Sequence, residues 1–258
     1  MLVPQKPTVR KSDIVQGLRE LGLKEGDAIL VHSSLSSFGY VEGGADTVID
    51  ALLETVGKSG TVVVPTFTAT EQHSARNPPV FSPSTTPSLA GRIPETFRKR
   101  PEAIRSRDPT HSVAVIGAKA VYLTQDHEKC ITPCGIGSPY LKLAEIDGYI
   151  LFIGVGLECN TTFHAVEELA NVPYHLQLDW VYGRIINDDG TAEVVKQKIH
   201  LWTAKTDFWK MEPIFLSDGI MKKGKIGNAT VRLVRAKPMI DPTLKLVEKD
   251  PEYLLMKT

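Results

Sequence analysis

The sequence has few cysteines and no net charge, and each absence argues against a class of protein. Its three cysteines, Cys130, Cys134 and Cys159, are an odd number that suggests no disulfide framework and favours a reducing compartment. The 30 lysines and arginines equal the 30 aspartates and glutamates. This balance argues against wholesale binding to nucleic acid or to an anionic membrane, although a local basic patch can still hold a phosphate.

Long apolar runs and the common phosphate-binding signatures are also missing. The longest apolar stretch, from Tyr149 to Leu157, is far too short to span a bilayer. The first six residues lack the apolar run of a signal peptide. No Walker lysine and no GxGxxG pattern occurs, and Cys130 and Cys134 have no second Cys/His pair at zinc-finger spacing. We therefore expect a cytoplasmic protein without a metal site.

What the sequence does contain is an alternation of apolar strands and amphipathic helices. With 258 residues, 42% of them hydrophobic, and no linker or internal repeat, it predicts a single domain, 1–258. Strands are predicted at 27–32, 61–65, 112–116 and 149–153, and helices at 14–21, 46–56, 93–99 and 139–145. The strand–loop–helix–strand order implies parallel strands with helices covering a sheet.

The remaining segments have a different character. Residues 66–90 are polar and contain four prolines, which predicts a long surface loop. From residue 177 the pattern becomes antiparallel: strands at 178–186 and 192–202 flank the turn Asn187-Asp188-Asp189-Gly190, so that 177–202 forms a hairpin. A helix at 207–216, one strand at 225–236 and a helical C-terminal tail are expected to follow.

The stretch from Gly154 to Glu168 contains the densest group of reactive side chains. It follows a buried strand and opens a helix, a common place for ligand sites in α/β folds. His164 and Glu167 are three residues apart and share a helix face, and a carboxylate beside an imidazole orients a general base. Cys159, five residues before His164, is either a nucleophile for covalent acyl chemistry or a small buried thiol, and the second interpretation is preferred.

Three other polar segments each have a functional and a plain interpretation. The loop from His32 to Gly39 offers hydroxyls and N–H groups to a phosphate or an amide chain, or is an ordinary polar loop. Arg105 and Arg107 suit a phosphate, or are surface arginines on a turn. Ser138 caps a helix with Pro139 at its first position, and that helix start either receives an anion or is capped for stability alone.

Taken in order, these segments resemble the aminoglycoside 3-N-acetyltransferase family, which is unrelated to the GNAT acetyltransferases. The similar pieces span nearly the whole chain and are specific only together. They are VHSSLSSFGYVEGG (31–44), TVVVPTFT (61–68), GRIPETFRKRPEAIRSRDPTHSVAVIG (91–117), GSPYLKL (137–143), 154–167 and GKIGNATVRL (224–233). The resemblance implies a three-layer α/β/α sandwich around a mixed, largely parallel sheet with an antiparallel C-terminal portion. It also implies acetyl transfer from acetyl-CoA to an amine.

The resemblance also implies roles for individual residues. His164 is the base, helped by Glu167 or Glu158, and Thr162 is the hydroxyl near the thioester. The residues that line the acetyl-CoA groove would be His32, Ser33, Ser34, Leu35, Ser36, Ser37, Phe38, Gly39, Arg105, Ser106, His111, Ser112, Val113 and Ser138.

Two departures from the family pattern concern the acceptor. Members often read His-Asp-Ser-Asn-Thr-Thr where this chain has residues 157–162, and many have histidine at the position of Asp108. Glu158 keeps a carboxylate, but residues 171–202 contain no dense acidic cluster of the kind that a polycationic aminoglycoside requires. The sequence therefore supports the acetyl donor better than the antibiotic acceptor.

These observations predict a cytoplasmic, acetyl-CoA-dependent N-acetyltransferase acting on a primary amine of a small molecule. The 3-amino group of an aminoglycoside antibiotic is the candidate acceptor that the resemblance implies. Acetyl would move directly within a ternary complex, without a metal, since the CoA thiolate leaves easily. A Cys159-dependent acyltransferase or thioester hydrolase, and a CoA-binding protein without catalysis, are the alternatives. No nucleic-acid or membrane partner is expected, and the chain is either a monomer or a homodimer.

Overall fold

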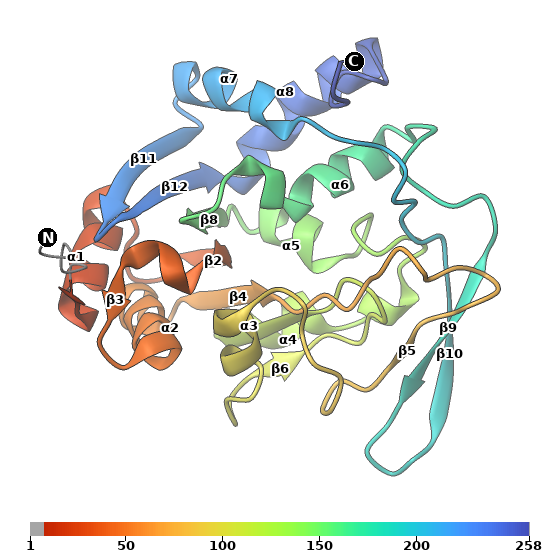
Figure 1. Cartoon of the computed structure of the whole chain (residues 1–258), viewed down its shortest axis with the longest axis horizontal. Coiled ribbons are helices and arrows are strands. Elements are labelled where there is room, and N and C mark those ends of the chain that lie inside the picture. Colours follow the sequence, from red (N-terminus) through yellow and green to blue (C-terminus); the bar gives the residue numbers. More distant parts are fainter. Residues whose placement is uncertain (1–7, 258) are drawn as a thin grey trace, which may run out of the picture.

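A computed structural model describes residues 8–257, and its centre is a seven-stranded mixed sheet (Figure 1). The strands lie in the order β11-β12-β8-β2-β4-β7-β6. Their bounds are β2 (Ala28–Ser33), β4 (Thr61–Pro65), β6 (Ile104–Arg105), β7 (Val113–Gly117), β8 (Tyr149–Ile153), β11 (Met221–Ile226) and β12 (Ala229–Arg235). The four strands predicted from apolar runs are all present, because each is buried on both faces and reads as a continuous apolar segment.

The sheet is mixed, as predicted, but less parallel than expected. Strand β2 pairs in parallel with β4 and with β8. The pairings of β4 with β7, β7 with β6, β8 with β12 and β12 with β11 are antiparallel. The antiparallel C-terminal portion is confirmed, whereas the prediction of parallel strands holds only at the centre, where helical crossovers connect the strands.

Helices cover both faces of this sheet and give the three-layer α/β/α arrangement that was predicted. One apolar core lies between the sheet and α1 (Lys11–Leu21), α2 (Gly44–Val56) and α3 (Arg92–Phe97). The core on the opposite face involves α4 (Ala120–Thr124), α5 (Pro139–Glu145), α6 (Thr161–Leu169), α7 (Glu212–Ser217) and α8 (Ala236–Lys249). Neighbouring residues of one strand alternate between the two cores, as Ile29 and Leu30 of β2 do.

Helix boundaries agree with the sequence to within a few residues, and local chemistry sets them. Helix α1 begins earlier than predicted, because the Asp13 carboxylate accepts a hydrogen bond from the Arg10 amide rather than capping the helix itself. It ends at Gly22, whose positive φ of 113° suits glycine. Helix α5 has the predicted bounds, and the Ser138 side chain accepts from the Leu141 amide as its N-cap.

A smaller sheet lies beside the main one and is formed by the predicted hairpin and part of the segment that was predicted to be a loop. Strands β9 (Val181–Ile186) and β10 (Ala192–Gln197) form the predicted hairpin with shorter strands, and β5 (Val80–Phe81) pairs in parallel with β9. Residues 66–90 are therefore more than a surface loop, since Phe81 is buried and packs in a small apolar cluster with Ile185 and Val195. Strands β1 (Thr8–Val9) and β3 (Tyr40–Val41) form a two-stranded pair elsewhere.

The single strand predicted at 225–236 is wrong. The chain makes a tight turn at Gly227, whose φ is 56°, so the segment divides between β11 and β12 of a hairpin. Ala236 already begins α8. The sequence signal was ambiguous because Gly227-Asn228 sits inside an otherwise strand-like pattern.

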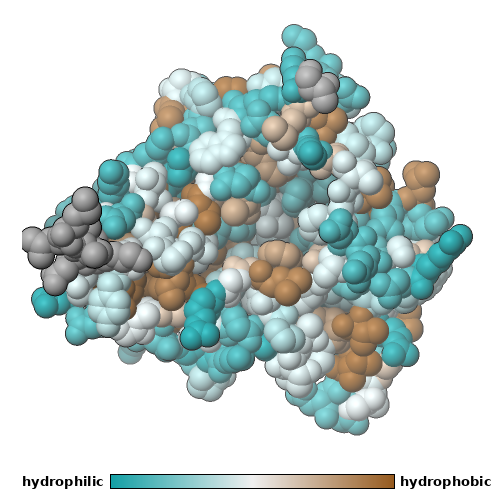
Figure 2. All heavy atoms as spheres, viewed as in Figure 1, coloured by the Kyte–Doolittle hydropathy of each residue, from teal (hydrophilic) through white to brown (hydrophobic). Residues whose placement is uncertain are grey.

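The surface facing the viewer in Figure 2 is mostly hydrophilic, with separate apolar patches, one of them over the small sheet. Val80, Tyr182 and Val194 of that sheet are exposed. Among residues 8–257, no helix has the length and apolar character that crossing a membrane requires. The first six residues, whose composition argued against a signal peptide, lie outside the described part of the chain.

Candidate active site

A cavity of about 380 Å³ lies beyond the carboxyl ends of β2, β4 and β8. This is the edge of the sheet at which α/β folds bind ligands. Its walls combine histidines with apolar side chains and one carboxylate. The lining residues are His32, Ser33, Pro65, Phe67, Leu89, Ala90, His111, Val155, Glu158, Cys159, Thr161, His164 and Trp202.

The turn after β8 brings the start of α6 to this cavity. Gly154 has a φ of 67°, and a Cβ atom there would lie 1.7 Å from the Ser37 hydroxyl, so only glycine allows the two loops to approach this closely. Asn160 then caps α6 by accepting from the Thr162 amide at 3.1 Å. The helix therefore begins at the cavity and presents His164 one turn later.

His164 is paired with a buried carboxylate, as the sequence predicted. Its Nδ1 lies 2.7 Å from Oε2 of Glu167. The Glu167 side chain is fully buried and also lies 3.2 Å from Nδ1 of His175. Burial by itself would raise the pKa of Glu167, but the hydrogen bond and charge of His164, together with His175, bring that pKa below its ordinary value. Glu167 thus remains ionised and orients the imidazole.

Glu158 lines the same cavity but has a different partner. Its Oε1 accepts from the Gly156 amide at 2.9 Å, and the residue is exposed at the cavity mouth. Of the two carboxylates considered from the sequence, Glu167 is the one hydrogen-bonded to His164. Cys159 also lines the cavity and is exposed, so the buried thiol preferred from the sequence is wrong. Partial burial and the Glu158 charge still raise the pKa of its thiol, which disfavours the nucleophilic thiolate.

Thr162 does not reach the cavity. It is fully buried behind the first turn of α6, whereas Thr161 lines the cavity wall. The two threonines are adjacent, and only the rotation of the helix decides which faces the ligand space. Thr161, not Thr162, is therefore the threonine that faces the cavity.

Four imidazoles meet where this cavity adjoins a smaller one that also includes His164, which the sequence did not predict. The ring centroid of His200 lies 4.2 Å from that of His111, 4.0 Å from His175 and 4.9 Å from His164. Burial, then the neighbouring imidazoles, lowers the pKa of His111 and of His200 well below its ordinary value. His32 stacks on Phe152, and burial followed by the His164 charge lowers its pKa to about 3. These three rings are therefore neutral at pH 7.

A second cavity, of about 560 Å³, adjoins the first through Ser33. It is lined by Ser33, Ser34, Leu35, Ser36, Gly39, Tyr40, Val41, Gly44, Gly91 and Arg92. Most of the predicted serine loop is thus at a cavity, and the first residue of α2 faces it. Arg92 was missed as a site residue, although it lies in one of the family-like segments and is exposed here.

Several residues predicted for the acetyl-CoA groove face the interior instead. The Arg105 guanidinium donates to the carbonyls of Thr66, Pro83 and Thr86 and to two hydroxyls. Ser106 bonds His127, and Ser138 donates to the Cys134 carbonyl. The residues buried away from both cavities are Phe38, Ser106, Ser112, Val113 and Ser138. Ser37 packs on Gly154 behind the loop.

Comparison with known proteins shows which family the sequence and the fold resemble. The model of a family described as aminoglycoside 3-N-acetyltransferase matches residues 30–248. The aminoglycoside N(3)-acetyltransferase VII of Streptomyces paromomycinus is 34% identical over 90% of this chain and 89% of its own length. A structure of AAC-IIIb with CoASH has a TM-score of 0.82 at 28% identity, covering 98% of this chain and 100% of the other. A mutant of AAC(3)-IVa in complex with a gentamicin also has a TM-score of 0.82, at 27% identity, covering 99% of this chain and 94% of the other.

Proposed function

The chain belongs to the aminoglycoside 3-N-acetyltransferase family of acyltransferases, and we propose that it moves acetyl from acetyl-CoA directly onto the 3-amino group of an aminoglycoside. The observation that carries this proposal is the 2.7 Å pair of His164 and Glu167 at a cavity that adjoins the serine-lined one. Such an arrangement suits a base that deprotonates an amine next to a bound thioester.

Each group in the proposed step has one task. Nδ1–H of His164 donates to Glu167, which leaves Nε2 as the acceptor. The substrate ammonium gives one proton to Nε2, and its nitrogen then attacks the thioester carbon. The C–S bond breaks, and the departing CoA thiolate takes the second proton from the nitrogen, which leaves the neutral amide and CoA thiol. Thr161 and nearby backbone N–H groups are placed to stabilise the oxyanion. Since the thiolate leaves readily, the reaction as written requires no metal.

The second cavity is the proposed site of the donor. AAC-IIIb, which this chain resembles, has been solved with CoASH. Ser33, Ser34 and Ser36 offer hydroxyl and amide groups to the pantetheine chain, while the N-terminus of the 13-residue helix α2 and Arg92 suit the diphosphate. Acetyl-CoA as donor also places the activity in the cytoplasm.

The first cavity is the proposed site of the acceptor. A gentamicin is the ligand named for the AAC(3)-IVa complex. Glu158 supplies the carboxylate that an ammonium group needs, and Trp202 and Phe67 supply apolar walls for a sugar-like ring. The Cys159 alternative is disfavoured, because a raised thiol pKa leaves little thiolate at neutral pH.

Product mass spectrometry with acetyl-CoA, gentamicin-type and kanamycin-type aminoglycosides, and simple amines tests the proposal. We expect aminoglycoside-dependent acetylation, with Cys159→Ala retaining most of it. His164→Ala lowers kcat by about 10²- to 10⁴-fold, the range of general acid–base catalysis, without weakening acetyl-CoA binding. His73→Ala, which changes a histidine away from both cavities, serves as the matched control.

Glu167→Gln lowers kcat in the same direction as His164→Ala, because the amide no longer favours the correct tautomer. Glu158→Gln instead raises KM for the aminoglycoside. Wild-type turnover in His164→Ala, or an acetyl-enzyme formed without amine, would overturn the mechanism. Acetylation of simple amines alone would overturn the proposed acceptor.

A further inference from the structure

The buried imidazoles that continue inward from His164 have a geometry that general base catalysis does not require. One nitrogen from each of His164, His175 and His200 lies within 4.8 Å of the others. Tetrahedral coordination places nitrogens about 3.3 Å apart, given zinc–nitrogen bonds of about 2.0–2.1 Å. Side-chain rotations that move each nitrogen by about an ångström are therefore enough to bring all three onto one ion.

Carboxylates hold two of these rings from the outside. Glu167 contacts Nδ1 of His164 at 2.7 Å, and Glu168 contacts Nε2 of His200 at 2.9 Å. A carboxylate on one ring nitrogen, with the other nitrogen left to a metal, is the usual outer arrangement around ligating histidines. It fixes the ring and increases the basicity of the ligand.

Three atoms of the histidines and their carboxylates are buried and have no hydrogen-bond partner among residues 8–257: Nε2 of His175, Oε2 of Glu168 and Oε1 of Glu167. All three side chains are more than nine-tenths buried. An unsatisfied buried polar atom is costly, and such an atom in a native protein calls for an explanation such as a bound ion. Neutral His200, whose pKa burial lowers, is already in the form that binds metals.

We propose that His164, His175 and His200, with Glu168 beside them, bind one divalent transition metal such as Zn²⁺, and that the ion inhibits the enzyme by occupying the imidazole of the base. Three imidazoles suit zinc, copper or nickel better than magnesium or calcium. The inhibition rests on the proposed role of His164, whereas the binding does not.

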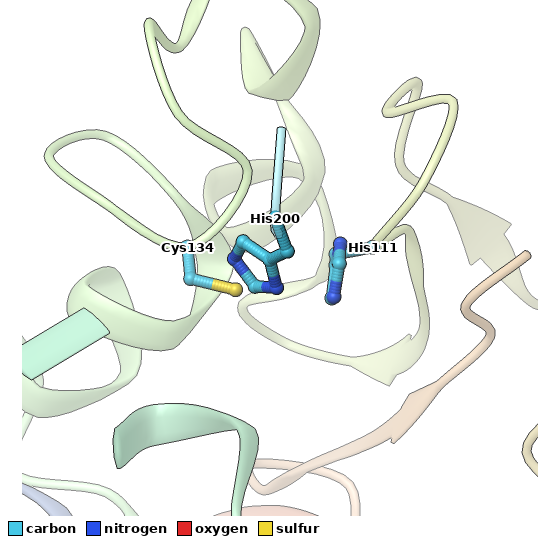
Figure 3. A group of neighbouring side chains, drawn as sticks. All are labelled: His111, Cys134 and His200. Atoms are coloured by element: carbon cyan, nitrogen blue, oxygen red, sulfur yellow. The ribbon is translucent and has the colours of Figure 1, made fainter. Parts of the chain in front are cut away.

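His200 also belongs to a second group of potential metal ligands, together with His111 and Cys134. Figure 3 shows His200 between the other two side chains, with the Cys134 sulfur directed toward it. All three are buried, and burial followed by the Glu168 charge raises the pKa of Cys134 well above its ordinary value, which opposes formation of the ligating thiolate. His164, in contrast, is 27% exposed and lines two cavities, which gives an ion a route to the histidine triad.

Direct binding to the full chain is measured first, without substrates. Isothermal titration with ZnCl₂ should show one ion per chain, and CoCl₂ should give visible ligand-field bands without a near-ultraviolet thiolate band. His175→Asn and His200→Asn should each weaken binding by more than about 10-fold, the least that even outer-shell changes cost. His73→Gln, a histidine outside the cluster, should bind as the wild type does.

Inhibition is measured separately, by mass spectrometry of the acetylated product, since CoA thiol itself binds zinc. Zn²⁺ should inhibit the wild type over the concentration range in which it binds, and a chelator should restore activity. The absence of stoichiometric binding, equal binding in His175→Asn and the wild type, or a cobalt–thiolate band would overturn the site. Binding without inhibition would overturn only the proposed effect on the base.

Discussion

At the scale of single residues, the hydrogen-bond partners of a polar side chain show whether it faces a cavity or supports the structure. His164 has one partner, Glu167, and keeps an edge in the cavity. Each of the three guanidinium nitrogens of Arg105 donates to a protein acceptor, and burial lowers the pKa of this side chain to about 10. An arginine that the sequence suggests as a phosphate ligand can therefore instead stabilise a loop, by donating hydrogen bonds to its carbonyls.

Arg105→Ala should lower the free energy of unfolding rather than raise KM for acetyl-CoA. The change leaves the carbonyls of Pro83 and Thr86 without their donor, and an unsatisfied buried group costs about 1–3 kcal/mol. Urea denaturation measures the loss. Arg92→Ala is the matched control, expected to raise KM for acetyl-CoA with unchanged stability. If Arg105→Ala alone raised that KM in a fully stable protein, Arg105 would hold the cofactor after all.

At the scale of elements, the site depends on how closely the loop after β2 approaches the loop after β8. The Ser34 amide donates to the Ile153 carbonyl, and the Ser37 hydroxyl donates to the Ser34 carbonyl. Gly154 permits that approach by lacking a side chain. Ser33, the residue next to this contact, lines both cavities. The relative position of the two loops therefore sets the relative position of the two cavities.

Gly154→Ala tests this contact. A left-handed backbone costs a residue with a side chain about 1–2 kcal/mol, and the clash with Ser37 adds about 1–3 kcal/mol of overpacking. Gly190→Ala is the matched control, because Gly190 has a φ of 84° and open space around it. Thermal unfolding should show a larger loss for Gly154→Ala, with reduced activity in that variant only. Equal losses would mean that strain, not the close approach, matters there.

Helix α3 carries an ion-pair group with a defined pH dependence. Glu95 pairs with Arg98 and Lys99 and accepts from the Ser88 amide. Although burial opposes it, these hydrogen bonds and charges lower the pKa of Glu95 from 4.5 to about 2. Since the folded-state pKa is depressed, the stabilisation is complete above 4.5 and disappears as the pH falls toward 2.

The corresponding comparison is between the wild type and Glu95→Gln. The difference in their free energies of unfolding should be no more than about 1 kcal/mol near neutral pH, because the pair is partly screened by solvent. It should shrink between pH 4.5 and 2. Denaturation series across this pH range measure it, and a difference that grows on acidification would contradict the assignment.

At the scale of the whole molecule, two apolar cores share one sheet, while the small sheet has a core of three residues. The strands β2, β4 and β8 contribute to both large cores. The sheet of β5, β9 and β10 is held by Phe81, Ile185 and Val195 and by polar contacts such as that of Gln197 with Asp108. The segment that follows β10 carries His200 and supplies Trp202 to the first cavity, so the less strongly packed part of the molecule forms one wall of the proposed acceptor site.

Native-state hydrogen exchange should reveal this difference. Amides in β2, β4 and β8 should exchange only through global unfolding, and those in β9 and β10 should exchange about tenfold faster or more, through local opening. The single domain predicted from the sequence implies one cooperative denaturant transition, which the same samples test. Equal protection in both sheets would mean that the small sheet opens only with the rest.

The sequence by itself determined the features that depend on neighbours along the chain. The strands β2, β4, β7 and β8, the bounds of α5 and the His164–Glu167 pair were predicted because apolar periodicity, capping and a spacing of three residues act locally. The family-like segments added the donor and the class of reaction, and the family match confirmed them.

Only the tertiary structure decided which side chains from distant segments meet. His111, His175 and His200 are far apart in the sequence and converge because the segment after β10 folds back over α6. Arg105 turned inward because the 66–90 segment packs over it, and Thr161 rather than Thr162 faces the cavity because of the rotation of α6. The direction of a side chain depends on packing between elements, and periodicity along one element carries no information about that packing.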